Sequence, residues 1–224
     1  MLKIENTEVL GWEHAIRGMR NPMNSWEKSD SSWRYVAPAQ RESHILASYF
    51  DDSEFWIGPN DADLMSRLRN AGTDHRKFMR MITVYVDLTA PLYWWKEYDT
   101  YKVATVANST STMHKIHSKP FSIDDFSHDH MTPETLAFME TVVGRLEAIR
   151  LKYMEEGKNK EDWYDMIQLL PSSYNQMRTC TMNYETLINI YYARKAHKLE
   201  EWHSFCRWIE SLPYAKELII AAEE

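Results

Sequence analysis

The sequence predicts an α+β fold that is mostly helical, with a small central antiparallel sheet. Long segments carry apolar residues at helical spacing, and residues 81–89 alternate cleanly between apolar and polar side chains. Only 6 Gly and 8 Pro occur in 224 residues, which argues against a turn-rich β sandwich. Because 44% of the residues are apolar and 26% charged, we expect one globular domain over residues 1–224.

The first 72 residues are predicted to be helices separated by a polar loop. Residues 6–19 are weakly amphipathic, with Asn6 or Thr7 as the cap of the helix. Residues 21–33 are rich in Asn and Ser and are predicted to be a loop. Residues 37–50 and 60–72 both have helical patterns, and the second begins at a capping Asn60 and ends at Gly72.

A strand followed by a short helix is predicted next. In residues 81–89, one face carries apolar side chains and the other carries polar ones, with Ile82, Val84, Val86 and Leu88 opposite Thr83, Tyr85 and Asp87. Pro91 can then open a short helix over residues 92–99, because proline is tolerated in a first turn.

The second half is predicted to be a loop at residues 118–130, two helices, an extended segment at 174–182 and a final helical region. The longest helix covers about residues 133–156, with an apolar stripe formed by Leu136, Met139, Val143, Leu146 and Ile149. A shorter helix at 159–171 ends at Pro171. Residues 184–213 are helical almost throughout, with a break near Ala196.

Charge and cysteine content exclude several classes of protein. The formal net charge of −7 argues against bulk nucleic-acid binding, although a local basic pocket for one phosphate remains compatible with it. Two cysteines are too few for a disulfide framework. Without a signal-peptide pattern or an apolar run long enough to span a membrane, we expect a cytoplasmic protein with no membrane partner.

Histidines and cysteines offer two weak candidate sites. Four histidines lie within residues 114–130 and could hold a metal, but they lack the helical or cysteine-flanked spacing of known sites, so no metal is predicted. Cys180 lies beside Arg178, and Cys206 lies near His203. Either thiol could act as a nucleophile, but a small buried packing residue is the favoured interpretation for both.

Two neighbouring segments leave alternatives open. The aromatic block at residues 92–98 could stack a flat ring or simply fill the core, and Lys96 and Glu97 favour a pocket because charges beside buried aromatics need partners. Residues 100–115 could be a solvated loop or an anion-binding surface. They combine hydroxyls with cations, as a phosphate requires, namely Thr105, Ser109, Thr110, Ser111, Thr112, Lys102, His114 and Lys115.

The order of these features resembles the flavin-dependent thymidylate synthases, the ThyX family, over roughly residues 60–210. The helix that ends near His75 and the strand at 81–89 resemble the segments that precede the family's signature. The C-terminal match is stronger, because the family runs Leu-Pro, a strand, Asn on entry to a helix, a second Asn and then Arg. Here these positions are Leu170, Pro171, Asn183, Asn189 and Arg194.

The signature itself is altered. The family pattern R-H-R-x-x-S-x-N-x-x-S-x-R falls without gaps on residues 100–112, and its preceding Gln falls on Glu97. Hydroxyls are kept at Thr105 and Thr110, whereas the family's first triplet becomes Thr100, Tyr101 and Lys102. Because arginine binds phosphate in a bidentate way that Lys and Thr do not reproduce, the resemblance implies the fold more strongly than the activity.

The resemblance implies a homotetramer that transfers a one-carbon unit from methylenetetrahydrofolate to C5 of a pyrimidine deoxynucleotide, dUMP, with FAD as cofactor and NADPH as co-substrate. Arg194 would be catalytic by polarising a pyrimidine carbonyl. Flavin contacts would come from Asn183, Asn189, Tyr101, Lys102 and His75. Substrate contacts would come from Glu97, Lys102, Asn108, Ser109, Thr110, Thr112, His114 and Arg194. The alternatives are a relative that acts on a different pyrimidine nucleotide, and a non-catalytic binding or scaffold protein.

Overall fold

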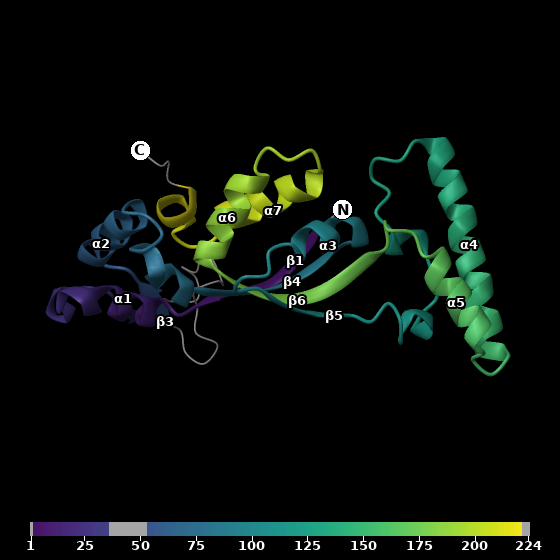
Figure 1. The fold of residues 1–224 in the computed structure, drawn as a ribbon, viewed down its shortest axis with the longest axis horizontal. Coiled ribbons are helices and arrows are strands. Elements are labelled where there is room, and N and C mark those ends of the chain that lie inside the picture. Colours follow the sequence, from purple (N-terminus) through teal and green to yellow (C-terminus); the bar gives the residue numbers. More distant parts are fainter. Residues whose placement is uncertain (1, 36–52, 221–224) are drawn as a thin grey trace. The chain divides into compact units, whose positions relative to one another are not determined.

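The computed structural model describes residues 2–35 and 53–220 and has the predicted α+β architecture (Figure 1). A four-stranded sheet has the strand order β1-β4-β6-β5, and β2 pairs antiparallel with β3. The strands are β1 (Lys3–Leu10), β2 (Ser32–Tyr35), β3 (Ser53–Trp56), β4 (Thr83–Pro91), β5 (Val106–Ser109) and β6 (Asn175–Asn183). The helix predicted at residues 37–50 lies outside the described residues.

Most of the predicted helices are confirmed. The helices are α1 (Trp12–Arg20), α2 (Pro59–Asn70), α3 (Leu92–Tyr98), α4 (Pro133–Glu155), α5 (Lys160–Leu169), α6 (Tyr184–Arg194) and α7 (Glu200–Glu210). Short 3-10 turns occupy parts of the predicted loops. The predicted break near Ala196 separates α6 from α7. The predicted cap of α2 is wrong, because the helix begins at Pro59 with Gly58 as its N-cap and Asn60 lies within its first turn.

The chain divides into two compact units. Unit 1 contains residues 1–3, 88–100 and 108–179, and unit 2 contains residues 4–87, 101–107 and 180–224. Strands β4 and β6 each contribute residues to both units. A single domain over residues 1–224 stays a prediction.

The N-terminal segment corrects the sequence interpretation, because residues 3–10 form strand β1 and the helix begins only at Trp12. Asn6 and Thr7 therefore cap no helix. Pairing within the sheet overrides a weak helical pattern here, and the Asn6 side-chain amide donates to the Asp87 carboxylate at 2.8 Å. Gly11 separates the two elements with φ +95, and a Cβ there would lie 2.1 Å from the carbonyl oxygen of Met81.

The aromatic block on α3 belongs to the core of unit 1. Trp94 and Trp95 are 0% and 1% exposed, and Trp94 stacks on Tyr98 with a centroid distance of 5.3 Å. The Trp95 indole N–H donates to the carbonyl oxygen of Gln176 at 2.9 Å. The guanidinium of Arg178 lies over this ring, 4.1 Å from its centre. These contacts favour the core interpretation over a stacking platform.

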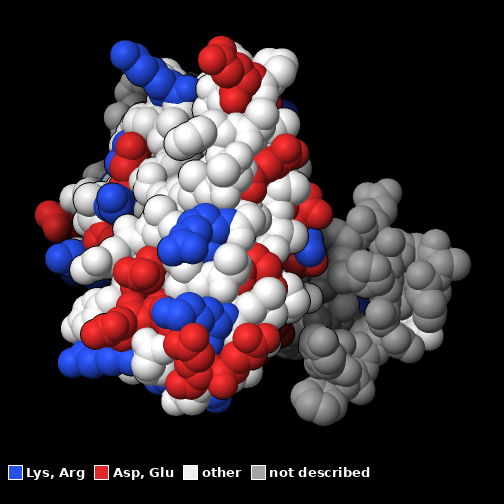
Figure 2. Space-filling view, turned by 90° about the vertical axis from the view of Figure 1, so that its right-hand side faces the viewer, with Lys and Arg blue, Asp and Glu red and all other residues white. Residues whose placement is uncertain are grey.

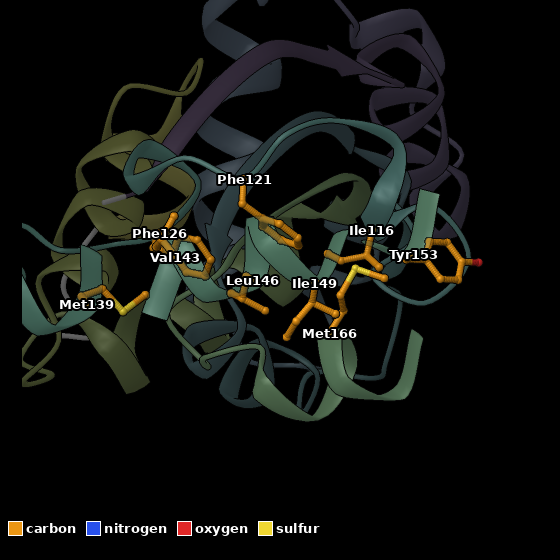
Figure 3. Packing of buried hydrophobic residues seen from close by; sticks show 9 residues of the cluster. All are labelled: Ile116, Phe121, Phe126, Met139, Val143, Leu146, Ile149, Tyr153 and Met166. Carbon is orange, nitrogen blue, oxygen red and sulfur yellow. The ribbon is translucent and has the colours of Figure 1, made fainter. Parts of the chain in front are cut away.

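Helices α4 and α5 close a second hydrophobic cluster in unit 1. Figure 3 shows the side chains gathered between these helices and the segment at residues 116–126. The cluster contains Ile116, Phe121, Phe126, Met139, Val143, Leu146, Ile149, Tyr153 and Met166. Four of the five residues of the predicted α4 stripe are buried, and only Leu136 is partly exposed. The cluster holds the segment that follows β5 against α4.

Unit 2 contains a fully buried carboxylate, Asp61 on α2. Its oxygens accept hydrogen bonds from the Arg20 guanidinium at 2.6 Å and from the hydroxyls of Ser29 and Ser31 at 2.8 and 2.7 Å. The backbone amides of Asp30 and Ser31 also donate to it. Asp61 therefore ties the segment at residues 29–31 to α1 and α2.

Candidate functional site

The main candidate site is a cavity of about 650 Å³ that lies entirely within unit 1. It is bordered by the C-terminal end of β4, the N-terminal end of β6 and the segment that follows β5. Its lining residues are Lys3, Thr89, Thr110, Ser111, Lys115, Ile116, Ser118, Lys119, Asp124, Asp125, Tyr174, Asn175 and Met177. The altered signature segment, residues 100–112, thus borders the cavity through Thr110 and Ser111, and Lys115 follows three residues after its end.

Backbone contacts hold the hydroxyl groups of this cavity in place. The amide of Thr110 donates to the carbonyl oxygen of Met177 at 2.9 Å, which joins the segment to β6. The Ser111 hydroxyl accepts from the amide of His114 at 2.8 Å and keeps its own proton for another acceptor. The Ser118 hydroxyl donates to the carbonyl oxygen of Lys115 at 2.7 Å and offers its lone pairs.

Three lysines and two aspartates line the cavity, so its formal charge is one unit positive although the whole chain is at −7. Lys119 forms an ion pair with Asp125. The hydrogen bond that the Lys119 ammonium donates to the Asp125 carboxylate raises the pKa of Lys119 despite partial burial. Lys115 forms no ion pair within the described residues, so its charge is available to an anion.

Two residues at the start of β6 add neutral donors. Burial raises the pKa of the Tyr174 phenol, which keeps its proton at neutral pH. The side-chain oxygen of Asn175 accepts from the Ser127 hydroxyl at 2.8 Å, which leaves the amide nitrogen as the group that can donate. Hydroxyl, amide and ammonium donors around one cavity match the needs of a phosphate or another hydroxyl-rich anion.

The structure gathers only part of the predicted substrate set at this cavity. Thr110 lines it, whereas the other predicted positions of unit 1 do not, namely Glu97, Asn108, Ser109, Thr112 and His114. Asn108, Ser109 and His114 are exposed, and Glu97 and Thr112 are partly buried.

A second candidate group lies in unit 2 around Arg194, at the C-terminal end of α6. The Arg194 guanidinium donates to the Tyr101 hydroxyl at 2.8 Å and lies 4.7 Å from the centre of the Trp202 ring. The rings of Tyr101 and Trp202 are 6.1 Å apart in an edge-to-face arrangement. Two aromatic side chains therefore hold a half-buried arginine in one orientation, as a positioned hydrogen-bond donor requires.

The other residues of unit 2 that were predicted to contact a flavin differ in their exposure to solvent. Asn183 is 7% exposed and caps α6, since its side-chain oxygen accepts from the amide of Thr186 at 2.9 Å. Asn189, Lys102 and His75 are exposed. The hydroxyl of Thr186 donates to the carbonyl oxygen of Val103 at 3.2 Å, which joins the segment after Tyr101 to α6.

Sequence reasoning missed Lys3, Ser118, Lys119 and Asn175 at the cavity and Trp202 beside Arg194. Ser118 and Lys119 continue the run of hydroxyls and cations that begins at Asn108, so extending that run beyond residue 115 would have found them. Lys3 and Asn175 carry no local signal, because only the strand order brings β1 and β6 to the cavity.

Neither metal ligation nor a reactive thiol is supported by the described residues. Among residues 2–35 and 53–220, no group of three or more His, Cys, Asp or Glu side chains is arranged to hold a metal ion. Cys180 and Cys206 are buried and unpaired with each other. Burial, with a smaller effect from Glu210, raises the pKa of Cys206 to about 11, which disfavours the thiolate. No helix in the described part of the chain is long and apolar enough to cross a membrane.

His117 lies next to the cavity residue Ile116 and gives a prediction about pH. Its ring packs 5.0 Å from that of Tyr153, and its Nδ1 is buried with no hydrogen-bond partner among the described residues. Burial, together with the charges of Lys158, Lys115 and Arg150, holds the pKa of His117 below 6.5. His117 therefore binds a proton more readily in the unfolded chain than in the folded chain.

We expect the free energy of unfolding to fall as the pH drops below about 6.5 towards the lower pKa of folded His117. His117→Leu should flatten this dependence in urea unfolding measured between pH 8 and pH 5. The exposed His114→Leu is the matched control and should keep the dependence of the wild-type protein. An unchanged slope in His117→Leu would contradict the prediction.

Comparison with solved structures identifies the fold as that of thymidylate synthase X. The enzyme from Helicobacter pylori, solved with FAD and dUMP, is 16% identical, with a TM-score of 0.68, and the match covers 98% of this chain and 97% of that one. A second structure of the flavin-dependent synthase ThyX from Helicobacter pylori, also complexed with FAD and dUMP, is 16% identical. Its TM-score is 0.66 and the match covers 96% of this chain and 98% of that one. No protein-family model and no curated protein matches the sequence.

Proposed function

We propose that this chain is an enzyme of the flavin-dependent thymidylate synthase type, which transfers a one-carbon unit from methylenetetrahydrofolate to C5 of dUMP. FAD would be its cofactor and NADPH its reductant, and it would work as a homotetramer. The observation that carries the proposal is that a fold solved with FAD and dUMP in both neighbours extends over 98% and 96% of this chain. The donor-rich cavity of unit 1 and the positioned Arg194 of unit 2 support it.

The side chains predicted to contact the flavin in unit 2 carry the hydrogen-bonding groups that a flavin ring and its phosphates require. The exposed amide of Asn189 can donate and accept at a ring edge, and exposed Lys102 and His75 offer cationic or neutral donors for phosphate oxygens. The amide nitrogen of Asn183 can donate even though its oxygen caps α6. A bound flavin would supply the hydride, and the protein's task would be to bind, orient and stabilise charge.

Arg194 would act on the pyrimidine itself. Its guanidinium is held by the Tyr101 hydroxyl and the Trp202 ring, so it is oriented before the ligand binds. A carbonyl oxygen of the pyrimidine would accept from this guanidinium, which would stabilise negative charge that develops on that oxygen when C5 reacts. No protein thiol is needed in this scheme, in agreement with two buried cysteines.

An anionic group such as a phosphate would be held in the cavity of unit 1, by residues of that unit alone. Lys115 would supply the charge, and the Ser111 hydroxyl, the Tyr174 phenol and the Asn175 amide would supply neutral donors, in place of the arginines of the family's signature. A lysine ammonium acts as a point charge. This phosphate site would therefore depend on several neutral donors rather than on the two parallel hydrogen bonds that an arginine guanidinium donates.

An absorbance spectrum of freshly purified protein, followed by an assay of hydrogen release from C5 of dUMP, tests the proposed function. We expect a flavin band and a release that depends on dUMP and methylenetetrahydrofolate. A colourless protein that also fails to bind added FAD would contradict it.

Lys115→Glu tests the phosphate role separately from catalysis. We expect dUMP to bind about 10- to 100-fold more weakly, since a hydrogen bond to a charged group contributes about 1.5–3 kcal/mol. Binding of deoxyuridine, which lacks the phosphate, should be unchanged. Isothermal titration measures both, and Lys160→Glu on α5, outside the cavity, is the matched control. If the affinities for dUMP and deoxyuridine fall equally, Lys115 does not bind the phosphate.

A second candidate is an enzyme of this fold that acts on a different pyrimidine nucleotide. The observation that favours it is the loss of the arginine triplet, since Thr100 and exposed Lys102 now occupy its outer positions. Thermal-shift measurements with a series of pyrimidine mono- and diphosphates separate the two candidates. Stabilisation by dUMP without any C5 hydrogen release favours this second candidate, and stabilisation by no nucleotide favours a non-catalytic relative.

A further inference from the structure

Exposed aromatic side chains mark one place in unit 2. Charge marks no such place on the face that carries α4 and α5, where Figure 2 shows acidic and basic side chains interspersed. All nine tryptophans lie in the described residues, and only Trp26 and Trp33 are exposed, at 51% and 50%. Both line a cavity of about 470 Å³ within unit 2, which we call the tryptophan cavity. Its lining residues are Glu13, Ile16, Arg17, Arg20, Trp26, Ser29, Ser31, Ser32, Trp33 and Phe55.

The aromatic walls of this cavity are held in place by hydrogen bonds. The Trp33 ring packs edge-to-face on the buried Phe55 at 5.2 Å, and its indole N–H donates to the Glu13 carboxylate at 3.5 Å. The Trp26 indole N–H donates to the side-chain oxygen of Asn21 at 2.8 Å. Both indoles are therefore positioned before a ligand binds, while half of each side chain stays exposed. The volume of the cavity is in the range of small-molecule sites.

The rings of Trp26 and Trp33 are less covered than the neighbouring ring of Trp56. The Arg34 guanidinium lies over the Trp56 ring, 3.3 Å from its centre. Within the described residues, no cation lies over Trp26 or Trp33, and no other ring packs on Trp26. Their faces are therefore available to the ring of a ligand, because aromatic rings attract one another in offset and edge-to-face arrangements.

Three charged side chains line the cavity, and two of them are left for a ligand. The Asp61 carboxylate neutralises the Arg20 guanidinium. Glu13 and Arg17 lie one helical turn apart on α1, are exposed, and form no ion pair within the described residues. The Ser29 hydroxyl donates its proton to Asp61, so its oxygen can only accept a further hydrogen bond. The cavity therefore offers one cation, one carboxylate and one acceptor hydroxyl.

We propose that the tryptophan cavity binds a free aromatic α-amino acid, with its ring against the two exposed tryptophans, its carboxylate at Arg17 and its ammonium at Glu13. The two ionic groups of an α-amino acid are attached to one carbon, so side chains four residues apart on one helix can reach both. A purely cationic ligand would be repelled by Arg17, and a purely anionic one by Glu13. An uncharged ring would use neither charge.

This proposal concerns unit 2 alone and does not depend on the proposed function. Binding at the tryptophan cavity should survive Lys115→Glu, which reverses a charge in the unit 1 cavity. An aromatic residue inside a polypeptide lacks the free ammonium and the free carboxylate. N-acetyltryptophan amide therefore distinguishes a free amino acid from a peptide segment as the ligand.

A series of ligands tests the chemical class. Isothermal titration of the intact protein with L-tryptophan should give a dissociation constant below about 1 mM. Tryptamine, which lacks the carboxylate, and 3-indolepropionate, which lacks the ammonium, should each bind about tenfold more weakly or worse. L-Alanine, which lacks the ring, and N-acetyltryptophan amide should bind no better than these two. No heat with L-tryptophan at about 5 mM, or equal affinity for any of the four analogues, would overturn the proposal.

Single substitutions assign each charge. Arg17→Gln should lower the affinity for L-tryptophan to that for tryptamine, because the ligand carboxylate no longer contributes. Glu13→Gln should lower it to that for 3-indolepropionate, while the new amide oxygen still accepts from the Trp33 indole. Trp26→Ala should weaken the binding of L-tryptophan as well. Arg67→Gln, an exposed arginine of α2 outside the cavity, is the matched control and should leave the affinity unchanged.

The substituted side chains are all exposed, so the variants are expected to keep the fold, which circular dichroism checks. If Arg17→Gln and Glu13→Gln bind L-tryptophan as tightly as the wild-type protein, the two charges do not hold the ligand and the proposal is wrong.

Discussion

Replacing Asp61 with alanine is expected to lower the free energy of unfolding by about 3–5 kcal/mol, because it leaves the Arg20 guanidinium buried without its counter-ion. Arg20 is 3% exposed and Asp61 is 0% exposed. The substitution also removes the acceptor of the Ser29 and Ser31 hydroxyls, so the segment at residues 29–31 loses its attachment to α2. Urea unfolding at pH 7 measures the change.

Asp63→Ala is the matched control for this prediction. Asp63 lies on the same helix and pairs with Arg67, but both side chains are about two-thirds exposed. An exposed ion pair contributes little, so the control should change the free energy of unfolding by less than about 0.5 kcal/mol. If both substitutions lower the free energy of unfolding equally, the burial of Asp61 is not the cause of the decrease.

The pH dependence of the Asp61 contribution follows from its pKa. Burial alone would raise this pKa, but hydrogen bonds from Ser31, Ser29, Arg20 and the Asp30 amide together hold it below 3.8. The contribution is therefore present above about pH 3.8 and is lost as the pH falls through the lower pKa of the folded state. Asp61→Asn should remove this part of the acid sensitivity.

Replacing Arg194 with alanine is expected to lower C5 hydrogen release by about 10²–10³-fold, which is the usual cost of removing one preorganised donor to a developing oxyanion. Arg194 is half-buried, so the folded state should survive its loss, and thermal unfolding with circular dichroism checks this. Stopped-flow or steady-state assays with dUMP at saturation measure the rate.

Two variants make the Arg194 result interpretable. Arg207→Ala on α7 removes an exposed arginine whose contact is the Ser204 hydroxyl, and it should leave the rate unchanged. Tyr101→Phe keeps the arginine but removes the hydroxyl that orients it, so a smaller loss of rate is expected. If Arg194→Ala changes neither ligand affinity nor rate, the residue is structural and the nucleotide role of α6 is wrong.

The helical second half was predictable from the chain because its signals are local. The side chains of Thr132 and Asn159 cap α4 and α5 by accepting hydrogen bonds from the backbone amides three residues later, and Asn183 caps α6 in the same way. Each signal lies within one turn of the element that it begins, so no distant residue is needed to interpret it.

The N-terminal half was less predictable because its elements are stabilised by distant partners. Residues 3–10 form a strand through pairing with β4, about 80 residues away, and their own pattern is too weak to decide between helix and strand. The short strands β2 and β5 were missed for the same reason, since four residues carry little periodicity.

The sequence by itself determined the α+β class, the order of the C-terminal elements and the hydroxyl- and cation-rich character of residues 108–115, because these depend on residue type and spacing along the chain. Only the tertiary structure decided which of those groups share a cavity. It placed Thr110, Ser111 and Lys115 with Lys3 and Asn175, and it placed Arg194 against Tyr101 and Trp202. Hydrogen bonds and strand pairing between residues far apart in the chain set these neighbours, and one chain's pattern of residue types does not encode such pairings locally.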